Sequence, residues 1–202
     1  MKKIVIVSNR LPLKVEKNEQ SIVFSPTSGG LATGLKSVHE SGNALWIGWP
    51  GVPKEELEEA QIDEVKASLG AMNFKPVHLD QEQVEDFYLG LSNKSIWPLF
   101  HYFKQNVVFD DNQWEAYKQV NEQFAQAVVE EVQPGDTVWV HDYQLLLVPD
   151  LIRQKIQDVT IGFFLHIPFP SFEIFRIFPK RQEVLRGLMG ADLIGFHTYD
   201  YQ

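Results

Sequence analysis

The sequence contains no cysteine, which excludes disulfide bonds and thiolate metal sites and fits a cytoplasmic protein. Positive charge is also scarce, because 18 Lys and Arg stand against 27 Asp and Glu, for a formal net charge of −9. Nucleic acids and anionic membrane surfaces repel such a chain, so neither is expected as its main partner. A phosphorylated small ligand stays compatible, since a few local cations or backbone N–H groups suffice to bind it.

Signatures of several enzyme classes are missing. The six histidines are scattered, no HExxH pattern occurs and no cluster of carboxylates flanks them, so no metal site is expected. The absence of GxSxG and of a Walker A pattern weighs against serine hydrolases and P-loop kinases. No apolar run approaches the length of a membrane span. The run Ile4–Val7 is too short for a signal peptide and predicts a buried first strand.

Apolar runs of strand length alternate with amphipathic stretches, without linkers or repeats. Core strands are predicted at residues 4–7, 45–49, 74–79, 137–140, 159–165 and 192–196. Helices are predicted at 30–40, 54–69, 111–132, 143–155 and 180–189, with Pro149 kinking or dividing the fourth. A small hairpin is expected within 11–25. The alternation predicts one doubly wound α/β domain over residues 1–202, with a mainly parallel, Rossmann-like sheet.

Unusual polar and aromatic residues follow the predicted strands. Arg10 comes after the first, Trp46 lies late in the second, Asp142 comes after the fourth and His166 after the fifth. Ligands of open α/β sheets bind at the carboxyl ends of the strands. This placement favours a ligand site over a purely structural role for each residue.

A glycine-rich segment, Ser28-Gly29-Gly30, opens the first predicted helix. Free N–H groups and the helix dipole favour an anion there, which predicts a phosphate or diphosphate site. The alternative is a loop that needs positive φ. Arg10 could grip such an anion with two parallel hydrogen bonds, or it could form a surface ion pair.

Asp142 and His166 each allow two interpretations. Asp142 could cap the following helix or accept hydrogen bonds from sugar hydroxyls. His166 could bind a ligand hydroxyl or act in acid–base chemistry, or it could be a buried histidine bonded to backbone. Four aromatic residues could form walls for sugar rings or simply pack in the core, namely Trp46, Trp49, Trp97 and Tyr88.

Seven short motifs occur in an order that resembles the trehalose-6-phosphate synthase family. They are SNRLP (8–12), SGGL (28–31), WIGW (46–49), WPLFH (97–101), HDY (141–143), LHIPFP (165–170) and GFHT (195–198). The resemblance implies a two-domain GT-B glycosyltransferase, with this chain as its N-terminal, acceptor-side domain and the C-terminal donor-binding domain absent. It also implies transfer of glucose from UDP-glucose to glucose 6-phosphate with retention, which gives α,α-trehalose 6-phosphate and needs no metal or other cofactor.

The resemblance also assigns roles to nine residues. Asp142, which would bind acceptor hydroxyls, and His166, which would contact the transferred glucose, stand at catalytic positions. The substrate-binding positions are Arg10 and Tyr88 at the acceptor phosphate, Gly29 and Gly30 in a loop over the donor, and Trp46, Trp97 and Ile167 around the acceptor pocket.

The chain departs from the family pattern in two ways. Gln144 stands where many members have a second histidine, and the expected donor-binding residues lie outside the 202 residues. We therefore expect the chain alone to be inactive or nearly so. Two alternatives are a synthase with another acceptor or donor, such as a glucosylglycerol-phosphate synthase, and a non-catalytic regulatory domain that binds sugar phosphates. Assembly into a homo-oligomer stays open.

Overall fold

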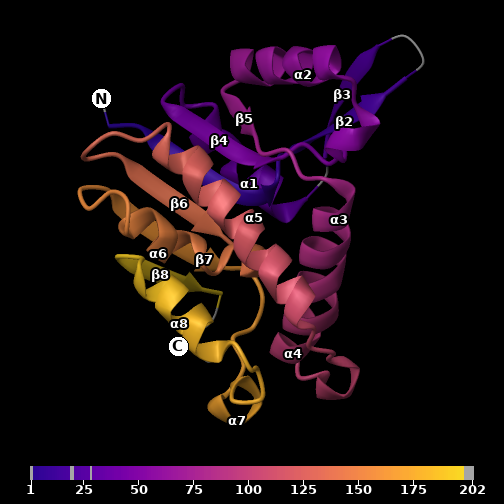
Figure 1. Ribbon diagram of the computed structural model, residues 1–202. Helices are drawn as coiled ribbons and strands as arrows, with labels where there is room; N and C mark the ends of the chain where they lie inside the picture. Colours follow the sequence, from indigo (N-terminus) through magenta and orange to yellow (C-terminus); the bar gives the residue numbers. More distant parts are fainter. Residues whose placement is uncertain (1, 19–20, 28, 198–202) are drawn as a thin grey trace.

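The computed structural model describes residues 2–18, 21–27 and 29–197. Within these residues the main sheet has six parallel strands, as predicted (Figure 1). They stand in the order β5 (Phe74–Pro76), β4 (Ala44–Trp49), β1 (Ile4–Arg10), β6 (Thr137–His141), β7 (Thr160–Leu165) and β8 (Leu193–Phe196). The predicted hairpin is a separate antiparallel pair, β2 (Leu13–Lys17) and β3 (Ile22–Pro26).

The strand order identifies the place where a ligand would bind. Numbered along the chain, the strands of the main sheet run 3-2-1-4-5-6, which is the Rossmann order. The winding therefore reverses between β1 and β6, where Val7 pairs with Ile47 on one side and Val140 on the other. The crevice of such a fold opens at the carboxyl ends of these two strands.

Helices connect the strands and cover the sheet. They are α1 (Gly30–His39), α2 (Glu59–Ala71), α3 (Gln81–Gln83), the π-helix η2 (Val84–Ile96), α4 (Trp97–Phe100), α5 (Asp111–Val129), α6 (Val148–Arg153), α7 (Phe172–Phe175) and α8 (Arg181–Met189). Short 3₁₀ turns are η1 (Lys54–Glu56), η3 (Lys104–Asn106) and η4 (Tyr143–Leu145).

The sheet separates two hydrophobic cores, as expected of a doubly wound domain. Side chains alternate along β1, so Val5 and Val7 enter one core and Ile6 the other. The larger core lies under η2, α5, α6 and α8, and the smaller one under α1, α2 and the hairpin (Figure 1). Burial on both faces explains why the strands are continuous apolar runs in the sequence.

Three predicted elements are shorter than expected or divided. The helix predicted at 54–69 is wrong in its first part, because Leu57 is extended and buried, and α2 starts only after Glu58 and Gln61 form a reciprocal cap. The strand predicted at 74–79 ends at Pro76, which has no N–H to donate. The helix predicted at 143–155 is divided, and Pro149 stands in the first turn of α6.

No element was predicted over residues 81–100, where α3, η2 and α4 form a continuous helical segment. Its buried face includes Gly90, Ser92 and Ser95, which are weak helix formers and interrupt the apolar pattern. A π-helix also has more residues per turn than the α-helical spacing assumes. The segment packs against α5 and carries Tyr88.

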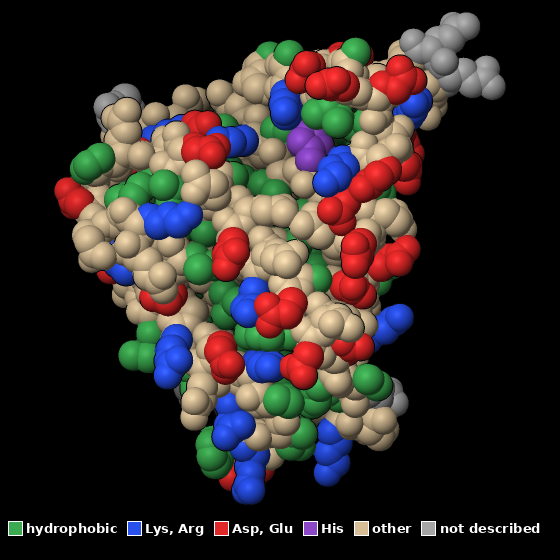
Figure 2. Space-filling model, viewed as in Figure 1, with side chains coloured by type: hydrophobic (Ala, Val, Ile, Leu, Met, Phe, Trp, Pro, Cys, Tyr) green, Lys and Arg blue, Asp and Glu red, His purple; other side chains and the backbone are tan. Residues whose placement is uncertain are grey.

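Charge is unevenly distributed over the surface. Figure 2 shows acidic side chains gathered around α2 and α3, and basic ones near α7. In the described part of the chain, no helix combines the length and the apolar character that crossing a membrane requires.

Candidate active site

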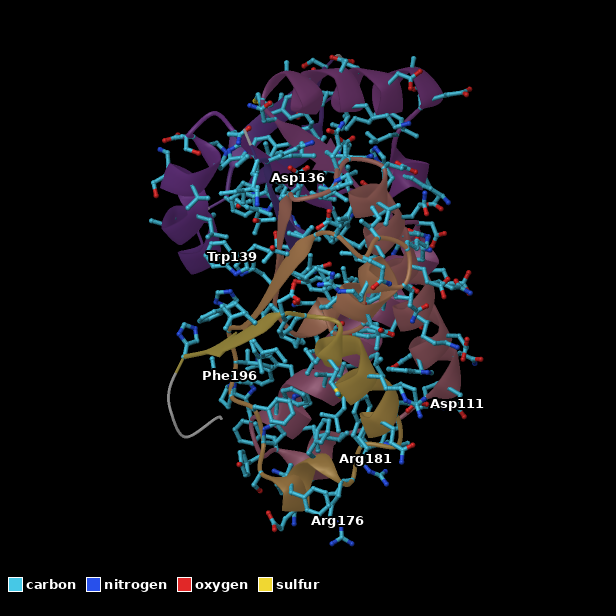
Figure 3. All side chains as sticks on the ribbon, turned by 90° about the vertical axis from the view of Figure 1, so that its left-hand side faces the viewer. Asp111, Asp136, Trp139, Arg176, Arg181 and Phe196 are labelled. Atoms are coloured by element: carbon cyan, nitrogen blue, oxygen red, sulfur yellow. The ribbon has the colours of Figure 1, made fainter. Side chains whose placement is uncertain are left out.

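Two adjoining cavities open at the carboxyl edge of the main sheet. The larger, of about 650 Å³, lies between α1 and the ends of β6, β7 and β8, and the smaller, of about 200 Å³, lies at the end of β1. Leu31, His141 and Asp142 line both. In Figure 3, Trp139 of the larger cavity lies between α1 and the end of β8 that carries Phe196. The cavities thus meet at the reversal between β1 and β6.

Arg10, the last residue of β1, lines the smaller cavity. Its guanidinium carbon lies 4.7 Å from the ring centroid of Trp49, and the side chain also packs against Gly51, whose φ is +89°. Among the described residues, Arg10 forms no ion pair and its buried Nε has no hydrogen-bond partner. Burial lowers the pKa of Arg10, and Tyr88 partly opposes this. The surface ion pair considered from the sequence is therefore not formed with any of the described residues.

Two aromatic residues complete the wall of the smaller cavity. Tyr88 of η2 meets Trp49 edge-on, with ring centroids 6.0 Å apart. Trp46 is buried and donates its indole N–H to Ser8 Oγ at 2.7 Å. Ser8 Oγ in turn donates to the carbonyl of Arg10 at 2.8 Å. This chain of hydrogen bonds fixes the end of β1, so the backbone that carries Arg10 is held in place.

Gly29 and Gly30 stand at the start of α1, beside both cavities. Gly29 is extended, with φ −158°, and neither glycine has a positive φ, so the interpretation based on positive φ is wrong. A Cβ at either position would meet nothing within 4 Å. The first turn of α1 has no acidic residue, and its free N–H groups suit an anion. Ser28 lies outside the described residues.

Asp142 links the two loops that follow β6 and β7. Its Oδ1 accepts hydrogen bonds from the N–H of Tyr143 at 3.0 Å and of His166 at 3.2 Å. Its Oδ2 has no partner among the described residues and is not sealed from the cavities. Burial raises the pKa of Asp142 to about 6, although the two N–H groups and His197 oppose the rise. Oδ1 therefore joins the two loops, and Oδ2 is free to accept a hydrogen bond from a ligand.

His166 lines the larger cavity through its ring. Its Nε2 lies 3.0 Å from Nδ1 of His141, and its ring centroid lies 4.7 Å from that of Phe164 and 5.5 Å from that of His197. Burial, assisted by the electrostatic influence of the neighbouring His197, lowers the pKa of His166 to about 4. The interpretation of His166 as a ring bonded to backbone is wrong, because its ring partner is another imidazole.

Trp97 and Ile167 do not line either cavity. Trp97 is 39% exposed and stacks on His101, with ring centroids 4.0 Å apart, and Ile167 is buried in the larger core. The remaining residues assigned from the sequence do gather at the cavities, and they are Arg10, Gly29, Gly30, Trp46, Tyr88, Asp142 and His166. Their roles stay predictions.

Further polar residues at the cavities, to which no individual role was assigned from the sequence, include His141, His197 and Asn9. His141 and His197 line the larger cavity and Asn9 the smaller. Both polar side-chain atoms of Asn9 are buried without a hydrogen-bond partner in the described part of the chain. Each residue belongs to one of the motifs and stands at the carboxyl end of a strand, which is the signal that could have identified it.

Comparison with known proteins agrees with this geometry. The model of glycosyltransferase family 20 matches residues 2–202. The chain belongs to glycosyltransferase family 20. Both cavities therefore lie in a domain of a family of sugar-transferring enzymes.

Several proteins similar to this chain are named as trehalose-phosphate synthases. The UDP-forming α,α-trehalose-phosphate synthase 1 of Aspergillus fumigatus is 48% identical over 206 residues, covering 98% of this chain and 39% of the relative. A trehalose-6-phosphate structure from E. coli, bound with UDP-2-fluoro glucose, has a TM-score of 0.79 and 31% identity, with 99% of this chain and 41% of that one covered. The UDP-forming α,α-trehalose-phosphate synthase of Burkholderia xenovorans in complex with glucose-6-phosphate has a TM-score of 0.77 and 30% identity, with 98% and 41% covered. The chain thus spans about two fifths of the length of these relatives.

Proposed function

We propose that the chain forms the acceptor-side half of the active site of a UDP-forming α,α-trehalose-phosphate synthase. The reaction would transfer glucose from UDP-glucose to glucose 6-phosphate with retention, in a GT-B enzyme. The observation that carries the proposal is Arg10, which presents a guanidinium without a counter-ion among the described residues to a cavity that Tyr88 and Asp142 also line. Membership of family 20 and the names of the relatives support it.

The smaller cavity suits a sugar phosphate because its polar groups match the two parts of such a ligand. The guanidinium of Arg10 would bind the phosphate through two N–H groups. Oδ2 of Asp142 would accept a hydrogen bond from a sugar hydroxyl. The transferred glucose would occupy the larger cavity, beside His166 and the start of α1.

In the transfer step, the bond between C1 of glucose and the donor phosphate oxygen breaks and a bond from C1 to the acceptor hydroxyl oxygen forms on the same face. The acceptor proton passes to the departing phosphate oxygen, so no protein base is required. Asp142 and His166 would orient the two sugars, and their placement would lower the barrier chiefly through proximity. Residues of a C-terminal domain would bind the UDP group.

Binding of glucose 6-phosphate to the 202-residue chain, measured by isothermal titration calorimetry, tests the proposal. Arg10→Ala is expected to weaken binding about 10- to 100-fold, because a hydrogen bond to a charged group contributes about 1.5–3 kcal/mol. Arg186→Ala is the matched control, since Arg186 is an exposed arginine of α8 that lines neither cavity. Equal affinities of the wild type and Arg10→Ala would overturn the role of Arg10.

The proposal includes two properties that need separate tests. Transfer without a metal would leave turnover unchanged after dialysis of the complete enzyme against a chelator. A cytoplasmic location would be seen by fractionation of cells that express the protein.

Glycerol 3-phosphate, assayed beside glucose 6-phosphate, would identify a family member with another acceptor.

A further inference from the structure

The imidazoles of His141, which is buried and lines both cavities, and His166, which is half-buried and lines the larger one, form a pair. Nδ1 of His141 and Nε2 of His166 lie 3.0 Å apart, which requires a hydrogen on one of these two nitrogens. His141 is 1% exposed, and its ring centroid lies 4.8 Å from that of Trp139. Both rings are neutral near pH 7, because burial lowers the pKa of His141 to about 3 and that of His166 to about 4.

Two arrangements of the hydrogens satisfy this contact. In the first, Nε2–H of His166 donates to Nδ1 of His141, so the single ring hydrogen of His141 must lie on its Nε2. Nε2 of His141 is buried and has no partner among the described residues. The first arrangement therefore buries an unpaired N–H, which is unfavourable and rare in folded proteins.

In the second arrangement, Nδ1–H of His141 donates to Nε2 of His166. Nε2 of His141 then carries no hydrogen and is an unpaired acceptor. Buried unpaired acceptors are tolerated more often than buried unpaired N–H groups. The ring hydrogen of His166 must now lie on Nδ1, which has no partner in the described part and is not sealed from the larger cavity. The larger cavity is then lined by two residues with unused polar atoms, a donor at His166 Nδ1 and an acceptor at Asp142 Oδ2.

We propose that His141 is a positioning residue that holds His166 with its hydrogen on Nδ1, so that His166 donates a hydrogen bond to an oxygen of the bound sugar. The inference rests on the proposed function for the identity of the ligand, but its tautomer component does not. A fixed donor and a fixed acceptor on the wall of one cavity match sugar hydroxyls, since each hydroxyl can both donate and accept. His166 then acts as an orienting group and not as a base.

Long-range ¹H–¹⁵N NMR of the imidazoles in the wild-type chain, at about pH 8 where ordinary histidines are neutral, tests this assignment. The signals of His166 are identified by their loss in His166→Gln. Two histidines in the same spectrum serve as references, because a carbonyl can only accept. His101 contacts the carbonyl of Trp97 through Nδ1 at 2.7 Å, and His39 that of Asn73 through Nε2 at 3.1 Å. His166 is expected to match His101, and a match to His39 would overturn the inference.

Two variants separate donation by His141 from mere packing. An asparagine amide can place an N–H near the position of Nδ1, so His141→Asn is expected to keep the hydrogen of His166 on Nδ1. His141→Phe places a ring of similar size there without a donor, and the hydrogen is expected to shift mainly to Nε2, the preferred site in free histidine. The same tautomer in both variants would exclude donation by His141. If His141→Phe fails to fold, the wild-type spectrum still decides the question.

The tautomer and the ligand can fail independently. A hydrogen on Nδ1 in a chain that binds no glucose 6-phosphate would support the assignment for His166 and overturn the proposed function. A hydrogen on Nε2 in a chain that binds glucose 6-phosphate through Arg10 would do the reverse.

Discussion

Asp142 combines a half-buried carboxyl group with a backbone conformation that strongly favours glycine. Its φ is +76° and its ψ is 170°, a region in which other residues are strained by about 1–3 kcal/mol. The two N–H groups that donate to Oδ1 hold it there. Such strain at a cavity is typical of a residue that is kept for function and not for stability.

Removing the charge of Asp142 is predicted to increase the stability of the folded chain, by an amount that depends on pH. The folded-state pKa of about 6 exceeds the unfolded value, so the folded state binds more protons between about pH 4 and 6 and stability falls as pH rises through that window. At pH 7 the ionised carboxylate costs up to about 3 kcal/mol. Asp142→Asn is expected to raise the free energy of unfolding in urea by this order at pH 7, and by less at pH 4.5. An equal effect at both pH values would contradict the argument.

The sequence predicted which residues lie at the site better than it predicted which of them contact one another. A position at the end of a strand was enough to select Arg10, Asp142 and His166. The contact between His141 and His166 joins residues 25 positions apart through strands β6 and β7, so it depends on register, which no local pattern specifies.

At the level of the elements, two glycines near the cavities differ in whether the structure would accept a side chain in their place. Gly30 has free space where a Cβ would project and an ordinary φ, whereas Gly51 has a φ of +89° and its Cβ would collide with the guanidinium of Arg10. Gly30 lines the larger cavity only. Their substitution should therefore separate helix stability from the placement of Arg10.

Gly30→Ala is expected to stabilise the chain by about 0.4–1 kcal/mol, because alanine restricts the unfolded state. Gly51→Ala is expected to destabilise it by about 1–2 kcal/mol through the unfavourable φ, and to weaken glucose 6-phosphate binding by displacing Arg10. Urea unfolding and calorimetry measure both effects. Similar glucose 6-phosphate affinities for the two variants would show that Gly51 does not position the guanidinium.

The core strands and the long helix α5 could be predicted because burial on two faces or on one stripe leaves a regular pattern. The segment 81–100 could not, since its π-helical turns and buried small polar residues break that pattern. Leu57 also escaped prediction, because a single extended residue between η1 and α2 is chosen by tertiary packing and not by local propensity.

At the level of the whole molecule, the charges around the larger cavity bear on catalysis. Its described lining contains His141, His166 and His197 but no Lys or Arg. A diphosphate leaving group gains negative charge during transfer and requires cationic or N–H groups to stabilise it. The start of α1 supplies some N–H groups, which do not replace cationic side chains.

We therefore predict that the isolated 202-residue chain releases no UDP from UDP-glucose and glucose 6-phosphate above the uncatalysed rate. A coupled assay of UDP release measures this, with a complete family member of defined activity as the positive control. Turnover by the isolated chain would show that residues described here suffice for the reaction.

The guanidinium of Arg10, which packs on Trp49 and Gly51, also predicts how buffer anions affect ligand binding. It is a localised positive site in a protein of net charge −9, and no carboxylate among the described residues neutralises it. Inorganic phosphate and sulfate carry the same oxygens as the terminus of a sugar phosphate, so we expect them to compete for the proposed phosphate site. Apparent affinities for glucose 6-phosphate will accordingly be lower in phosphate buffer than in a buffer whose anion is monovalent and weakly hydrogen-bonding.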